Sequence, residues 1–430
     1  MISDIYITSM QNYLTKHLRC ILCGSTHITP YLSLGKMAPA NSFVSFKDIS
    51  KPEKKYPLGL LYCHKCHSSQ LTHTIAPAML FAHYAYYSST SPLLVSHFID
   101  YAHTLKRKFP KLMKQLVVDI GSNDGVLLKP LQKIGAHILG VDPARECSNV
   151  AVQSGIPTIQ KYFTPALAKQ IQKKYGNASI ITANNVIAHT PFIHDFIRGI
   201  RTLLQSDGVF VFEVKYMGDI LEHNEFDIIY HEHVFSYLLH PLYVLLDKHE
   251  LKIIDVQHMQ IHGGSLRVYA SHKRAHMTVQ PSVQEMLTQE KNKGYLRFST
   301  YRSFAQNPPR IKKKLQTLLR ALVKKGKRIA GYGASAKGTT MLQYCELYTD
   351  TIAYIVDNAS SKIGTYTPAT HIPIVDPKEL KIRKPDYILL LAWDHKNTIM
   401  KKEQWFTQSG GVYIVPVPTP ALFKQPSETA

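Results

Sequence analysis

Four consecutive residues, Tyr230-His231-Glu232-His233, combine side chains that proteins use to move protons. Histidine titrates near neutrality and a nearby carboxylate can fix its tautomer, so the stretch suits general acid–base catalysis. On a strand or loop, Tyr230 and Glu232 would share one face, and His231 and His233 the other. A metal site and a plain polar loop are the alternatives, although HExxH spacing is absent and no further cluster of ligands stands out.

Two CxxC pairs near the N-terminus predict a metal site. Cys20 and Cys23 form the first pair, and Cys63 and Cys66 the second. Each CxxC turn directs two sulfurs at one ion, and two turns complete a tetrahedral zinc site. Because four protein ligands leave no open position, we expect this zinc to be structural. The insert between the pairs is longer than in usual zinc ribbons. Histidines that could substitute as ligands are His64, His67 and His73.

The stretch VVDIGSNDG, residues 117–125, predicts a strand, a tight glycine loop and the start of a helix at about residues 126–128. Gly121 and Gly125 can adopt backbone angles that are closed to other residues, and they let a ligand approach the main chain. A second strand, residues 138–141, ends at Asp142, an acid placed to bond ribose hydroxyls.

Charge decides which cofactor suits this first loop. Asp119 before the loop and Asp124 within it would repel a pyrophosphate and attract a cationic sulfonium or an amino group. The loop is therefore predicted to bind S-adenosylmethionine rather than NAD. A βα turn that binds nothing is the alternative.

Polar residues also follow a later strand, predicted at residues 180–186. Ligands of open α/β sheets sit outside the carboxyl ends of the strands, so Asn184, Asn185 and His189 lie where chemistry is expected. A further strand is predicted at residues 209–214. The residues predicted to bind the cofactor are Asp119, Gly121, Asn123, Gly125, Asp142, Asn184 and Asn185.

A second glycine loop, GYGASA at residues 331–336, fits the dinucleotide-type pattern GxGxxA. Its glycine amides, Ser335, Lys337 and a helix N-terminus suit a diphosphate. One acidic and one basic loop suggest two different ligands. The residues predicted to bind substrate are Gly333, Ser335 and Lys337 here, and His262 and Arg267 in the glycine turn HGGSLR.

Composition limits the class of protein. The 430 residues favour two or three domains, and a hydrophobic share of 45% is enough for buried cores. No apolar run approaches the roughly 18 residues of a membrane span, and no signal peptide is recognisable, so we expect a cytoplasmic protein without a membrane partner. The net charge of +21 is scattered and accompanies no nucleic-acid-binding signature, so no nucleic-acid partner is expected.

The order of motifs resembles that of S-adenosylmethionine-dependent sugar C-methyltransferases, most closely the dTDP-sugar 3-C-methyltransferases. The motifs are CxxC…CxxC, DIGSNDG, NVIAH, IYHEH, HGGSLRVY, GYGASAKG and YTPATHIPI. The resemblance implies an α/β fold in three parts. They are an N-terminal zinc-binding domain (1–80), a Rossmann-like class I methyltransferase domain (81–298) and a C-terminal Rossmann-like domain (299–430) that holds a nucleotide sugar.

The resemblance also implies a reaction. A methyl group would move from S-adenosylmethionine to C3 of a dTDP- or GDP-linked 4-keto-deoxysugar through an enolate, in a monomeric enzyme of branched-deoxysugar biosynthesis. We expect His233 to take the C3 proton, with Glu232 orienting it or holding a sugar hydroxyl. The other catalytic residues would be Tyr230, His189 and Tyr84, with Tyr87 as the alternative to Tyr84.

Two rival functions remain open from the sequence. An NAD-dependent nucleotide-sugar oxidoreductase would use the GYGASA loop, and a zinc-ribbon nucleic-acid binder would use the CxxC pairs and the basic charge. The YHEH and HGGSLR stretches argue against both.

Overall fold

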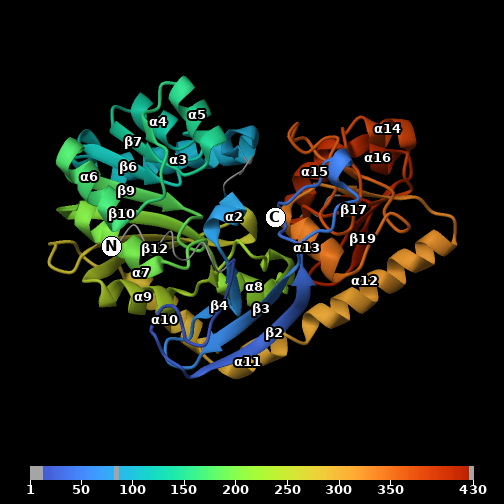
Figure 1. Cartoon of the computed structure of the whole chain (residues 1–430), viewed down its shortest axis with the longest axis horizontal. Coiled ribbons are helices and arrows are strands. Elements are labelled where there is room, and N and C mark those ends of the chain that lie inside the picture. Colours follow the sequence, from blue (N-terminus) through green and yellow to red (C-terminus); the bar gives the residue numbers. More distant parts are fainter. Residues whose placement is uncertain (1–12, 82–86, 426–430) are drawn as a thin grey trace.

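The computed structural model describes residues 13–81 and 87–425, apart from the side chain of His262. Within these residues the strands form sheets of two, four, seven and six strands. The seven-stranded (central) and six-stranded (C-terminal) sheets lie in separate lobes, and the four-stranded (N-terminal) sheet joins them from below (Figure 1).

The N-terminal sheet is built on a long antiparallel pair, because alternate positions such as Leu32 and Leu34 are apolar and buried. Its order is β11-β4-β3-β2, and β1 pairs separately with β5. The strand β11 (Phe235–Ser236) comes from far along the chain and begins two positions after His233. The remaining elements here are β1 (Leu14–Lys16), β2 (Ile28–Met37), η2 (Phe46–Asp48), β3 (Tyr56–Cys63), β4 (Ser69–Leu71), β5 (His73–Ile75) and α2 (Pro77–Phe81).

The central sheet has the order β12-β13-β10-β9-β6-β7-β8. The strands from β6 to β10 are parallel, whereas β13 is antiparallel to both of its neighbours. The chain reverses direction across the sheet between β6 and β9, and ligands of such sheets bind at the carboxyl ends there. The strands are β6 (Leu116–Ile120), β7 (His137–Val141), β8 (Thr158–Ile159), β9 (Ala178–Asn184), β10 (Leu204–Lys215), β12 (Leu251–Met259) and β13 (Ser265–His272).

Helices cover both faces of the central sheet, which is why its strands are almost continuously apolar. Side chains of α3 and α4 pack on the face that carries Val117 and Ile180, and those of α6, α7 and α9 pack on the face of Val118 and Ile181. The helices are η3 (Ser88–Thr90), α3 (Pro92–Lys108), η4 (Leu112–Lys114), α4 (Leu128–Lys133), α5 (Arg145–Gln153), α6 (Pro165–Tyr175), α7 (Ile193–Leu203), α8 (Met217–His223), η5 (Phe226–Ile228), α9 (Leu239–Lys248), η6 (Ile261–Gly263), α10 (Pro281–Asn292) and α11 (Phe298–Phe304).

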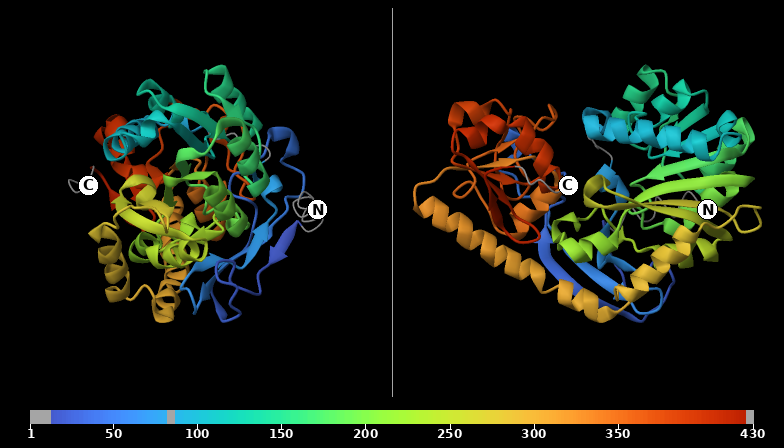
Figure 2. Two further views of the ribbon diagram at one scale, coloured as in Figure 1. Left: turned by 90° about the vertical axis from the view of Figure 1, so that its left-hand side faces the viewer. Right: turned by 180° about the vertical axis from the view of Figure 1, so that it is seen from behind.

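The C-terminal sheet, of order β16-β15-β14-β17-β18-β19, is parallel except for its edge strand β19. The long helix α12 runs along the outside of this lobe and leads back to the N-terminal sheet (Figure 2). The elements are α12 (Asn307–Lys324), β14 (Ile329–Tyr332), α13 (Ala336–Tyr344), β15 (Ile355–Val356), β16 (Ile374–Val375), α14 (Glu379–Arg383), β17 (Tyr387–Leu390), η7 (Trp393–His395), α15 (Lys396–Lys402), α16 (Gln404–Gln408), β18 (Val412–Val415) and β19 (Ala421–Phe423).

The predicted strands correspond to β6, β7, β9 and β10, which confirms the α/β fold class. One buried core runs through all three sheets and includes Leu60, Phe210 and Leu389. The lobes are therefore joined by packed side chains as well as by the chain itself. No helix in residues 13–81 and 87–425 is long and apolar enough to cross a bilayer.

Candidate functional site

A cavity of about 570 Å³ lies at the carboxyl ends of β6 and β9 and extends to the C-terminal lobe. Its walls come from the central and N-terminal sheets, from loops and helices of the C-terminal lobe, and from α2, which lies between the lobes in Figure 1. Predicted site residues on this wall are Asp119, Gly121, Asn123, Asp142, Asn184, Asn185, His189, Tyr230, His233, Ser335 and Lys337. Most of the sequence-predicted site is therefore brought together here.

The first glycine loop needs its glycine for two reasons. Gly121 has φ +70°, and a Cβ added there would lie 2.3 Å from Cγ2 of Val186. The Gly121 amide also donates to the Val141 carbonyl oxygen at 2.7 Å, which closes the turn. Gly125, with φ +80°, lies off the cavity wall and packs against Ile156. The backbone at Gly121 is thus open to a ligand on its cavity side.

Asp142 ties this loop to the next one. Its Oδ2 accepts from the Asn123 amide and its Oδ1 from the Ala144 amide, each at 2.8 Å. Burial raises the pKa of the Asp142 carboxyl. Each carboxylate oxygen has a second lone pair, so Asp142 can still accept from ribose hydroxyls as the sequence predicts.

The two loop acids differ in position. Asp119 lies on the cavity wall, where burial raises its pKa to about 7 and the Thr182 hydroxyl donates to Oδ1 at 2.7 Å. Asp124 lies off the wall, and its Oδ2 accepts from the Ser89 amide at 3.2 Å. The expectation that both acids attract a cationic ligand is therefore corrected, because Asp124 holds η3 against the loop.

The end of β9 supplies a polar acceptor to the cavity. Asn184 is the last residue of the strand, and Asn185 follows with φ +55°. Within the described part of the chain, Oδ1 of Asn184 is buried and has no hydrogen-bond partner. A buried acceptor of this kind is costly unless a ligand donates to it, and an amino group would do so.

The YHEH stretch forms a turn rather than an extended segment. The His233 amide donates to the Tyr230 carbonyl oxygen at 2.9 Å. The turn places the Tyr230 and His233 rings 4.0 Å apart, and both line the cavity. His231 lies away from the wall, with Nε2 bonded to the Tyr56 carbonyl oxygen at 3.2 Å. The alternating faces expected from an extended backbone are therefore wrong, because a turn brings residues three apart to one side.

Hydrogen bonding assigns the tautomer of His233. Its Nδ1 donates to the Ile228 carbonyl oxygen at 2.7 Å, which leaves the lone pair of the neutral ring on Nε2. Glu232 does not set this tautomer, contrary to the expectation that it orients His233. Its Oε1 instead accepts from Nδ2 of Asn41 at 2.8 Å, and burial raises the pKa of the Glu232 carboxyl to about 7.

His189 lies beside His233, with ring centroids 5.1 Å apart. Its other face stacks on Phe81 of α2, at 5.8 Å and an angle of 4°. Burial lowers the pKa of His189 to about 4, so its ring is neutral near pH 7. A neutral imidazole can donate one hydrogen bond without carrying charge.

The second glycine loop presents the N-terminus of α13 to the cavity. The Ser335 hydroxyl caps this helix by accepting from the Gly338 amide at 3.0 Å. Lys337 lies on the wall, but its Nζ pairs with Asp394 at 2.8 Å, so its charge is partly neutralised. Gly333 lies off the wall, where an added Cβ would approach Ala392 Cβ to 2.7 Å. Gly333 is therefore needed for packing, and its predicted contact with substrate stays a prediction.

One further predicted residue lies away from the cavity, and two others fall outside the described residues. Arg267 is buried, bonds Glu213 through Nε at 2.7 Å and stacks on Tyr101, so it lies away from the cavity and its assignment to substrate is corrected. Tyr84 and the His262 side chain lie outside the described residues. Tyr87, the alternative to Tyr84, lies off the cavity wall.

Several residues of the wall carry no signal in the sequence. Asn41 and Phe81 belong to no motif and reach the site only through the fold. Lys362 comes from a loop of the C-terminal lobe, and Asp394 and His395 come from η7. These wall residues contact groups that are distant in sequence, so local sequence patterns could not identify them as parts of the site.

The four cysteines of the CxxC pairs fit a zinc ion. Their sulfurs lie within 4.8 Å of one another, and the Cys20–Cys66 and Cys23–Cys63 sulfur distances are both 3.5 Å. Tetrahedral zinc with bonds of about 2.3 Å separates its sulfurs by roughly 3.8 Å. No disulfide joins the cysteines, so all four sulfurs remain available as ligands.

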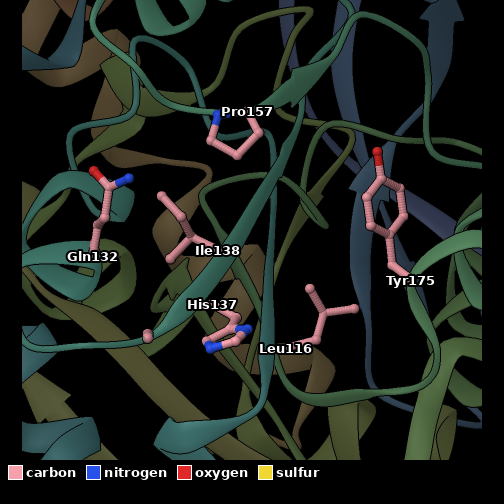
Figure 3. Close-up of a pocket in the computed structure, with 7 residues that line it drawn as sticks. Leu116, Gln132, His137, Ile138, Pro157 and Tyr175 are labelled. Carbon is pink, nitrogen blue, oxygen red and sulfur yellow. The ribbon is translucent and has the colours of Figure 1, made fainter.

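A second hollow lies at the opposite, amino-terminal edge of the central sheet (Figure 3). Residues at the starts of β6 and β7 line it, including Leu116, His137 and Ile138. It brings no acid near its histidine and lies away from the strand ends where ligands bind. We therefore assign no function to it.

Comparison with known proteins identifies three family models along the chain. They are described as "Putative zinc binding domain" (residues 20–81), "Methyltransferase domain" (97–256) and "C-methyltransferase C-terminal domain" (260–418). The C-methyltransferase NovU of Streptomyces niveus is 34% identical over 418 residues, which cover 97% of this chain and 100% of NovU.

More distant relatives match only in part. The mitochondrial ubiquinone biosynthesis O-methyltransferase of Bos taurus is 28% identical over 97 residues, which are 21% of this chain and 26% of that protein. The structure of magnesium protoporphyrin IX methyltransferase from Synechocystis PCC 6803 with bound SAM has 15% identity and a TM-score of 0.33, covering 42% of this chain and 81% of that one. A score this low adds nothing to the assignment.

Proposed function

The chain belongs to the C-methyltransferase family and is an S-adenosylmethionine-dependent enzyme, with the class I methyltransferase fold in its central sheet and a four-cysteine zinc site at its N-terminus; from this premise we propose that its acceptor is C3 of a nucleotide-linked 4-keto-deoxysugar. The product would be a branched deoxysugar. One observation carries the proposal, which is a histidine on the cavity wall, with its Nδ1 bonded to a backbone carbonyl, beside a tyrosine and a neutral histidine.

The chemistry explains why these groups suit a keto sugar. A carbon becomes nucleophilic once it loses a proton, and a ketone at C4 acidifies the proton at C3 by spreading charge onto oxygen. The site must therefore supply a base for C3 and hydrogen-bond donors for the C4 oxygen. Positioned bases contribute roughly 10²–10⁴-fold to rate, and donors at a developing oxyanion contribute on a similar scale.

Each described residue has a role in this proposal. His233 accepts the C3 proton on Nε2, because its Nδ1 is engaged by Ile228. Tyr230 and the neutral His189 donate to the C4 oxygen, and Tyr84 keeps its predicted place among these donors. S-adenosylmethionine, when bound, supplies an electrophilic methyl group. Asp119, Asp142, Asn184 and the open backbone at Gly121 support its binding on the other side of the cavity.

The C-terminal wall supports an anionic part of the acceptor. The N-terminus of α13 presents Ser335, Ala336 and Lys337 to the cavity, and Lys362 lies on the same wall. A helix N-terminus attracts phosphate through its unpaired amides and its dipole. A nucleotide diphosphate bound there would direct the sugar toward His233. The NAD-dependent oxidoreductase finds no support, because the matching family models and the full-length relative are methyltransferases.

The test is direct assay of methyl transfer. Zinc-loaded protein is incubated with S-adenosylmethionine and with dTDP- or GDP-4-keto-6-deoxyglucose. We expect one of the two sugars to gain a single methyl group, located at C3 by NMR. We also expect exchange of the C3 hydrogen in D₂O with S-adenosylhomocysteine in place of the methyl donor. Binding of S-adenosylhomocysteine without methylation or exchange of either sugar would refute the proposed acceptor.

A further inference from the structure

A short loop of the N-terminal region passes between the two lobes. We call residues 38–45 the arm. Its first residue is held by the C-terminal lobe, because the Ala38 amide donates to Oε1 of Gln343 at 2.9 Å and the Ala38 oxygen accepts from Nε2 at 3.1 Å. Near its other end, Val44 exchanges two backbone hydrogen bonds with Tyr366, at 2.9 and 2.8 Å. The arm is therefore fixed on both sides of Asn41.

Asn41 lies between the cavity and a buried carboxylate. Its side chain is half-buried and forms part of the cavity wall. Behind it, Glu232 is 3% exposed and lies off the wall. Nδ2 of Asn41 donates to Oε1 of Glu232 at 2.8 Å. Asn41 therefore lies between the cavity and Glu232.

The hydrogen bond to Glu232 sets the orientation of the Asn41 amide. Oε1 of Glu232 accepts from Nδ2, so the nitrogen end of the amide faces Glu232. One N–H of Nδ2 is engaged in this way, which leaves the second N–H and Oδ1 as a donor and an acceptor. A hydroxyl group both donates and accepts, so it matches this pair.

We propose that Asn41 contacts a hydroxyl of the sugar acceptor and that Glu232 is its positioning residue. This inference rests on the proposed function, since the ligand is the sugar of that reaction. It gives the N-terminal region a direct part in substrate recognition. It also explains why Glu232 stands in the YHEH stretch although it lies off the cavity wall.

The test reverses donor and acceptor. Asn41→Asp places two carboxylates together and removes the donor, whereas Asn41→Asp with Glu232→Gln restores a hydrogen bond, because the new amide donates to the new carboxylate. For Asn41→Asp we expect kcat/KM for the sugar to fall roughly 10- to 100-fold, the range of a lost hydrogen bond to a charged group. We expect the double variant to recover at least part of this loss, with unchanged S-adenosylhomocysteine affinity throughout. Ser42→Asp, an exposed position of the arm, is the charge-matched control.

The outcomes are distinguishable. Wild-type activity in Asn41→Asp, or a double variant no better than Asn41→Asp, would overturn the role of Asn41 alone. Loss of S-adenosylhomocysteine binding together with activity would overturn it too, because Asn41 would then only support the fold. Wild-type protein that binds S-adenosylhomocysteine but methylates neither sugar would refute the proposed acceptor, and the sugar contact of Asn41 with it.

Discussion

Two histidines on one cavity wall are held in different states by their surroundings. The Ile228 carbonyl holds the proton of His233 on Nδ1, so Nε2 can accept one. His189 stacks on Phe81, and burial lowers its pKa to about 4, so it stays neutral near pH 7. The first arrangement suits a base and the second a hydrogen-bond donor. The two histidines thus differ in their proposed roles because their surroundings differ, although they are the same type of residue.

His233→Asn tests this division. Asparagine has no basic nitrogen, so we expect a fall of roughly 10²–10⁴-fold in kcat and in exchange of the C3 hydrogen in D₂O. The affinity for S-adenosylhomocysteine should stay near that of the wild-type protein. His231→Asn is the matched control, because His231 belongs to the same turn but lies off the cavity wall. Full exchange in His233→Asn would move the role of base to Tyr230 or His189.

At the residue scale, the sequence could predict a role where that role depends on residues nearby in the chain, and not where it depends on a partner far away in the chain. The cysteine pairs were predictable because each CxxC turn is local, and Gly121 was predictable from the glycine loop in which it stands. Lys337 was expected to bind phosphate, but Asp394 pairs with it from 57 positions away. The pairing of Asn41 with Glu232 spans 191 positions. Such partners depend on how the lobes pack, and one sequence carries no local sign of that.

The α/β units of the central and C-terminal lobes share one arrangement of hydrogen bonds. Asp142 follows β7 and bonds the amides of Asn123 and Ala144. Asp357 follows β15 and bonds the amides of Ala334, at 2.7 Å, and Ala359, at 2.8 Å. In both units the acid after the second strand ties down the loop after the first. The sequence pattern located Asp142, but it could not show that the first partners of this acid are backbone amides.

The two acids should therefore separate the two ligands. Asparagine cannot accept from both amides, because one of its terminal atoms is a donor. We expect Asp142→Asn to weaken S-adenosylhomocysteine binding and leave binding of free dTDP or GDP unchanged, whereas Asp357→Asn should do the reverse. Losing one such bond costs about 1–3 kcal/mol, or roughly 5- to 150-fold in Kd. Calorimetry of both variants with both ligands measures these changes in Kd. Equal losses of affinity for both ligands in either variant would contradict separate sites.

At the scale of the whole molecule, a hydrogen bond and a strand pair connect the zinc site to the turn that contains His233. The Ile21 amide, between the first two cysteines, donates to Oε1 of Gln70 in β4 at 2.8 Å. The backbone of Gln70 pairs with Phe235 of β11, two positions after His233. The last zinc ligand, Cys66, precedes the start of the first central strand at Leu116 by 50 positions, yet the metal site is one strand pair away from the proposed base in space.

Removing zinc should therefore disable catalysis before it disables cofactor binding. Without the ion, the four thiols lose the bonds that hold the two CxxC turns together, so β4 no longer fixes β11 and the turn at His233. For Cys20→Ser, or after chelation, we expect zinc content and near-UV circular dichroism to fall and kcat to drop at least about tenfold, as for other lost supports of a site. The affinity for S-adenosylhomocysteine should change much less, because the Gly121 loop depends on β6 and β7. Cys345→Ala, a buried cysteine outside the cluster, should keep its zinc and its activity. Full activity in zinc-free protein would show that the N-terminal sheet holds the catalytic turn without the metal.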